Sequence, residues 1–194
     1  MSSQRLKNID HMIRNTRFDE AEKEITSIEL DNVLSQLDHL KLNYLKSVLY
    51  LETGRFQEGS QIAEQVIMKS RENNDHLVEL DGIICNLRAL GNLGRFEEAI
   101  QHLKRGEELL RTLYYSNISQ EDHELQKKEA LFLIQKGLLL MKPTKYRDLD
   151  HALRSYDRSL SLNKERGDKM GIANSSFGLG EIHFYNNDRE RALV

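Results

Sequence analysis

The hydrophobic positions of this chain follow a helical period from end to end. Near the N-terminus, Leu6, Ile9 and Ile13 recur at three- and four-residue spacing, which places them on one face of a helix. Short polar or glycine-containing turns interrupt this pattern at regular points. The pattern predicts helices at residues 4–15, 19–28, 34–53, 56–71, 76–93, 96–114, 122–141, 148–165 and 169–186.

One stretch, Leu87–Ile100, shows how two successive helices are joined. Gly94 follows the first helix, where a residue without Cβ can adopt the left-handed conformation that ends a helix. Phe96 then covers the turn, and Ala99 is small because two helix backbones approach closely there. The stretch is therefore predicted to form a helical hairpin.

The same arrangement recurs along the whole chain. It ends in TRFDEA, GRFQEG, GRFEEA, YRDLDHA and NDRERA, whose last residues are Ala21, Gly59, Ala99, Ala152 and Ala192. The intervals between these residues are 38, 40, 53 and 40, so the period is near 40 with one enlarged member. We therefore expect one solenoid over residues 1–194, with hairpins at 4–30, 34–72, 76–115, 122–165 and an incomplete 169–194.

Several of these residues match a known repeat signature. Leu179 and Gly180, with His183 in a tyrosine position, match its first half, and Ala152 with Tyr156 matches its second half. The chain thus resembles the tetratricopeptide repeat (TPR) family, in the long-period form found in polarity adaptors, kinesin light chains and bacterial peptide-sensing regulators. The resemblance implies an all-α, right-handed superhelical solenoid of antiparallel helix pairs. The chain departs from the signature at Thr16, where glycine is usual, and at Gly59, where alanine is usual.

Composition narrows the functional classes. The formal net charge is −3, which gives no electrostatic reason to expect binding to nucleic acid or to an anionic membrane. The single cysteine, Cys85, excludes an internal disulfide and suits a reducing compartment. No segment resembles a signal peptide, and the most apolar stretch, at residues 131–141, is too short to span a bilayer. A cytoplasmic location is therefore expected.

The sequence contains no recognisable catalytic, cofactor or metal motif. Its seven histidines are scattered, and none has the spacing of a metal site. Gly91 and Gly94 connect helix to helix, whereas a phosphate-binding glycine loop connects strand to helix. Cys85 and His183 are interpreted as packing residues. We therefore expect a non-enzymatic protein without a cofactor.

The TPR resemblance implies that the first helix of each hairpin lines a concave groove. The groove positions would be Tyr44, Val48, Leu51, Ile84, Arg88, Ile134, Leu138, Met141, Phe177, Glu181 and Phe184. Apolar side chains in such a groove favour an amphipathic helix or an apolar extended segment as partner. The alternative is that these residues are core, covered by neighbouring helices or by a helix missing from this fragment.

The expected function is a protein- or peptide-binding scaffold. Some TPR arrays grip acidic chaperone tails through a lysine, asparagine and arginine clamp, but here those places hold Leu6, Asp10, Leu45, Asp81 and Cys85. The alternative function is a peptide-sensing regulatory segment of a larger signalling or transcription-regulating protein. Because the fifth hairpin is incomplete, the sequence also suggests a fragment of a longer chain, or a homodimer formed through its open C-terminal end.

Overall fold

The computed structural model describes residues 2–30, 34–115 and 123–185, and every regular element in these ranges is an α-helix. The helices are α1 (Ser2–Arg14), α2 (Phe18–Leu30), α3 (Gln36–Glu52), α4 (Phe56–Glu72), α5 (His76–Leu93), α6 (Phe96–Tyr115), α7 (His123–Met141), α8 (Leu149–Arg166) and α9 (Lys169–Tyr185). The predicted all-α class is confirmed, and each predicted helix boundary lies within two residues of the observed one. Ala192, the last predicted repeat position, lies outside the described residues.

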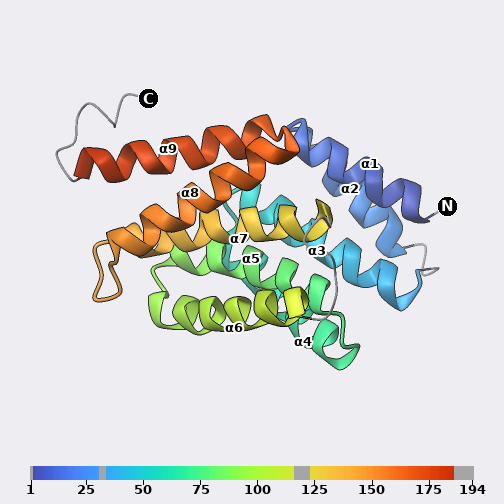
Figure 1. Cartoon of the computed structure of the whole chain (residues 1–194). Coiled ribbons are helices and arrows are strands. Elements are labelled where there is room, and N and C mark those ends of the chain that lie inside the picture. Colours follow the sequence, from blue (N-terminus) through green and yellow to red (C-terminus); the bar gives the residue numbers. More distant parts are fainter. Residues whose placement is uncertain (1, 31–33, 116–122, 186–194) are drawn as a thin grey trace. The chain divides into compact units, whose positions relative to one another are not determined.

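The contacts divide the chain into two compact units, Met1–Arg95 and Phe96–Val194. In the N-terminal unit, consecutive helices pack together, and α3 also contacts α1 and α5 (Figure 1). In the C-terminal unit, α7 packs on α8, α8 packs on α9, and α7 also contacts α9. Packing between nearest and next-nearest helices is typical of helical repeats. The boundary falls between α5 and α6, so a single solenoid over the whole chain stays a prediction.

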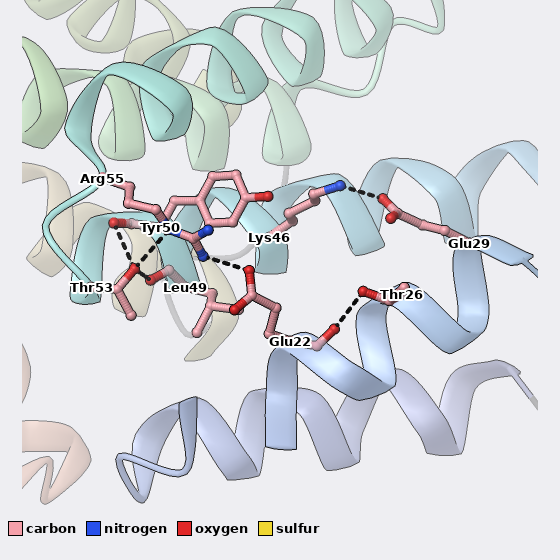
Figure 2. Close-up of polar contacts among 8 residues, drawn as sticks. All are labelled: Glu22, Thr26, Glu29, Lys46, Leu49, Tyr50, Thr53 and Arg55. Carbon is pink, nitrogen blue, oxygen red and sulfur yellow. Dashed lines mark hydrogen bonds and ion pairs between the residues drawn. The ribbon is translucent and has the colours of Figure 1, made fainter. Parts of the chain in front are cut away.

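Charged side chains join the first two hairpins of the N-terminal unit (Figure 2). Lys46 on α3 lies 2.6 Å from the carboxylate of Glu29 on α2, and Arg55 lies 2.9 Å from that of Glu22. The Arg55 guanidinium also lies 3.8 Å from the centre of the Tyr50 ring, so one cation contacts both a carboxylate and an aromatic face. Because these groups are partly exposed, each ion pair stabilises the unit by only about 0.5 kcal/mol.

The C-terminal unit is built around Tyr156 on α8, which is 1% exposed. A Cβ atom placed on Gly178 of α9 would lie 2.3 Å from the Tyr156 ring, and one placed on Gly137 of α7 would lie 2.6 Å from it. The ring therefore fills a slot that exists only because both neighbouring helices carry glycine there. Ala152, Ile182 and Ile134 complete the core around it.

In three of the turns between helices the left-handed residue is a glycine, as predicted for Gly94. Gly94 ends α5 with φ 73°, Gly167 ends α8 with φ 65°, and Gly54 follows α3 with φ 77°. Glycine adopts this conformation without steric cost. At the corresponding turn of the first hairpin, Thr16 adopts φ 57° although it carries a branched Cβ.

Replacing Thr16 with glycine should increase the free energy of unfolding by about 1 kcal/mol. The left-handed conformation costs a residue with Cβ about 1–2 kcal/mol, and the greater entropy of glycine in the unfolded chain offsets part of this gain. Urea denaturation followed by circular dichroism would measure the change. The matched control is Thr16→Ala, which retains Cβ and should show no comparable gain. Equal stability of the glycine and alanine variants would contradict the assignment of strain to Thr16.

The small residues of the repeat lie where helices cross, as predicted. Ala21, Ala99 and Ala152 are all fully buried. Glycine replaces alanine at position 59 of the second hairpin because the space there is tight: an added Cβ would lie 3.0 Å from the Leu51 side chain. The Gly59 carbonyl also accepts a buried hydrogen bond of 2.9 Å from Ser47, so α3 and α4 are in close contact at this point.

Candidate functional site

In the N-terminal unit, the predicted groove residues lie on α3 and α5. Tyr44 and Val48 pack against the edge of a core cluster that contains Leu51 and Cys85. Leu51 is 3% exposed and belongs to the core, so it offers no surface to a partner. Ile84 is half-buried on α5. Arg88 on α5 donates a 2.6 Å hydrogen bond to Glu52 of α3, which ties the two helices together.

A polar cluster surrounds Tyr44. Burial raises the pKa of its phenol well above the usual value, and the acidic groups of Asp81, Cys85 and Asp10 raise it further. These groups come from α1 and α5, while Asp10 is itself paired with Arg14 at 2.7 Å. The phenol therefore stays protonated and can only form hydrogen bonds. Because the cluster combines three helices, the sequence pattern of a single helix did not reveal it.

In the C-terminal unit, two predicted groove residues are buried. Ile134 is 6% exposed and Met141 is 9% exposed, and both pack in the same cluster as Tyr156. Ile134 and Met141 therefore lie in the core, as in the alternative interpretation of the groove positions. Leu138 lies on the same helix, α7, but is 38% exposed. Glu181 of α9 is half-buried, and its charge adds to the effect of burial in raising the pKa of Tyr156.

Several large exposed apolar side chains of the described C-terminal unit lie along α9. One face of this helix, formed by Gly171, Ser175, Gly178 and Ile182, is buried in the unit. Phe177 and Phe184 are each 68% exposed, and Met170 is 71% exposed. These three residues are seven apart, or nearly two helical turns, so they share one side of α9. We call Met170, Phe177 and Phe184 the α9 face.

Sequence analysis identified Phe177 and Phe184 in the α9 face but missed Met170. The seven-residue spacing between Met170 and Phe177 could have identified Met170, because residues seven apart lie on the same side of a helix. The aromatic end of the face continues into Tyr185, whose ring centre lies 6.4 Å from that of Phe184 in an edge-to-face arrangement. Tyr185 in turn lies beneath the guanidinium of Arg147, at 5.3 Å from the ring centre. The structure thus places a cation at one end of an apolar surface.

A second surface feature of this unit is a polar pocket of about 340 Å³, with Tyr114, Arg158 and Glu165 in its wall. Glu129 of α7 accepts hydrogen bonds from the Tyr114 hydroxyl of α6 and from Arg158 of α8, the latter at 3.2 Å. Burial and the bond to Glu129 raise the pKa of the Tyr114 phenol. Through these two hydrogen bonds, Glu129 links α7 to both α6 and α8.

The described residues contain no group of three or more His, Cys, Asp or Glu side chains that could hold a metal ion. None of the described helices combines the length and the apolar composition that a membrane crossing requires. The α9 face offers exposed apolar side chains with the guanidinium of Arg147 close to one end.

Comparison with known proteins supports the fold. No protein-family model and no curated protein sequence matches the chain. A crystal structure of TPR-like repeats from Podosopora anserina, in a protein described as a kinesin light chain, is similar with a TM-score of 0.61 and 14% sequence identity. The match covers 98% of this chain and 89% of that chain. The chain therefore has the fold of a TPR-like helical-repeat solenoid.

Proposed function

We propose that this chain is a non-enzymatic scaffold that binds another protein or a peptide through the α9 face. The TPR-like repeat fold suggests a protein-interaction role. The observation that carries the proposal is the exposure of Phe177 and Phe184, each 68%, on one side of a helix whose other side is packed. Large exposed apolar side chains in a row are typical of interaction surfaces.

The proposed mechanism is burial of these side chains by an apolar partner. Transferring a phenylalanine side chain from water to an apolar contact contributes about 1.5–3 kcal/mol. Two such anchors can therefore supply much of the free energy of a micromolar complex, about 8 kcal/mol, while the remaining contacts provide complementarity. A partner helix with an apolar face fits this arrangement, as does an apolar extended segment.

A pull-down from lysate of the source organism tests the proposal. The wild-type chain is compared with a Phe177→Ser, Phe184→Ser variant, and we expect the variant to capture the partner at least about tenfold less well, because both anchors are lost. The exposed positions of the two residues predict that the variant stays folded, which circular dichroism would verify. Leu30→Ser is the matched control, because Leu30 is 76% exposed in the N-terminal unit. Equal capture by the wild-type and variant chains would rule out the α9 face.

A further inference from the structure

The segment between α7 and α8 places positive charge at the end of the α9 face. Residues 142–148 include Lys142, Lys145 and Arg147, and this segment is the enlarged connection of the fourth predicted hairpin. Arg147 lies over the ring of Tyr185, which contacts Phe184. Arg147 of the basic segment therefore lies at the Phe184 end of the α9 face.

Two of the three cations in this segment have no carboxylate partner among the described residues. Lys145 pairs with Glu97 of α6 at 3.1 Å. Lys142 and Arg147 are both exposed and form no ion pair within the described ranges. The nearest acidic residue in sequence, Asp148, is engaged at the start of α8, where it accepts hydrogen bonds from the backbone and ring of His151 at 2.9 and 2.6 Å.

We infer that the partner of the α9 face is an amphipathic segment that carries acidic residues at one end, next to Lys142 and Arg147. This inference rests on the proposed function. The α9 face spans about 21 Å from Met170 to Phe184, at about 1.5 Å per helical residue, so a helix of about 16 residues covers it. Apolar side chains of that segment contact Phe177 and Phe184. Its acidic end contacts Arg147, which lies over Tyr185 at the Phe184 end of the face, and this contact favours one direction of binding.

Selection from a displayed library of random peptides of about 16 residues tests this inference. The library is selected in parallel on the wild-type chain and on the Phe177→Ser, Phe184→Ser variant, and peptides retained only by the wild type define binders of the α9 face. We expect these peptides to be enriched in Asp and Glu toward one end. Lys142→Glu, Arg147→Glu should weaken the best of them at least about tenfold at low salt, and the effect should shrink at high salt.

A matched charge control is Lys104→Glu, Lys164→Glu, which changes two exposed lysines of α6 and α8 by the same total charge and should leave binding unchanged. Face-dependent peptides without acidic enrichment, or with affinity unaffected by the Lys142 and Arg147 reversal, would overturn the inference but leave the proposed function intact. Absence of face-dependent peptides would overturn both. If the chain is instead a dimer whose mass is halved by Phe177→Ser, Phe184→Ser, the occupant is a second copy and the inference is also wrong.

Discussion

Replacing Gly178 with alanine should lower the free energy of unfolding by about 2 kcal/mol. The added Cβ would lie 2.3 Å from the ring of Tyr156, far inside van der Waals contact. The ring cannot retreat, because Gly137 lines its slot from α7 and Tyr156 is almost completely buried. Overpacking of this kind costs about 1–3 kcal/mol, which exceeds the gain in helix propensity from glycine to alanine of up to about 1 kcal/mol.

The matched control for this prediction is Gly91→Ala on α5. Gly91 is also helical, but a Cβ placed there meets no atom within 4 Å. The control should therefore show only the propensity effect, a stabilisation of about 0.5–1 kcal/mol. Urea unfolding of both variants gives the comparison. If Gly178→Ala and Gly91→Ala shift the midpoint in the same direction, the close packing of α9 on Tyr156 is not as described.

Replacing Arg71 with alanine should destabilise the N-terminal unit by about 2–3 kcal/mol. The Glu79 side chain is 1% exposed, and its carboxylate lies 2.5 Å from Arg71 and 3.8 Å from the ring nitrogen of His76. Removing one partner of a buried ion pair leaves a desolvated charge, which costs about 3–5 kcal/mol when the burial is complete. The expected cost is smaller because Arg71 is itself partly exposed.

Two further variants distinguish the cost of leaving Glu79 without Arg71 from the cost of removing any partly exposed arginine. Arg14 pairs with Asp10 on the exposed side of α1, so Arg14→Ala should cost only about 0.5 kcal/mol. Arg71→Ala combined with Glu79→Leu removes both charges and should recover part of the lost stability, because an apolar pair needs no compensating charge. Chemical denaturation measures the free energy of unfolding of each variant. Equal small losses in Arg71→Ala and Arg14→Ala would contradict the importance of the buried pair between Arg71 and Glu79.

The helices were predictable because local signals mark their ends. Asp75 caps α5 by accepting a 3.1 Å hydrogen bond from the backbone of Val78, and Gly94 ends the helix in the left-handed conformation. Both signals are visible in the sequence. The turn at Thr16 keeps the same geometry without glycine, which shows that packing of the hairpin overrides the preference of a single residue.

The candidate site was only partly predictable, because α7 and α9 are apolar on several sides. Periodicity alone does not say which side a neighbour covers. Tyr156 from α8 fills the slot between α7 and α9, and Ile134 and Met141 pack in the same core cluster, whereas Phe177 and Phe184 stay exposed. The basic residues at 142–147 are obvious in the sequence, but the position of Arg147 over Tyr185 depends on tertiary packing.

Site-specific photo-crosslinking is the most direct test of the central claim, that the α9 face binds a partner. Phe177 is replaced by p-benzoylphenylalanine, and the control carries the same group at Met68 of α4, which is 58% exposed. After irradiation in lysate of the source organism, we expect a discrete covalent adduct from position 177 and none from position 68. Adducts of equal yield at both positions, or an adduct from position 68 alone, would contradict the account.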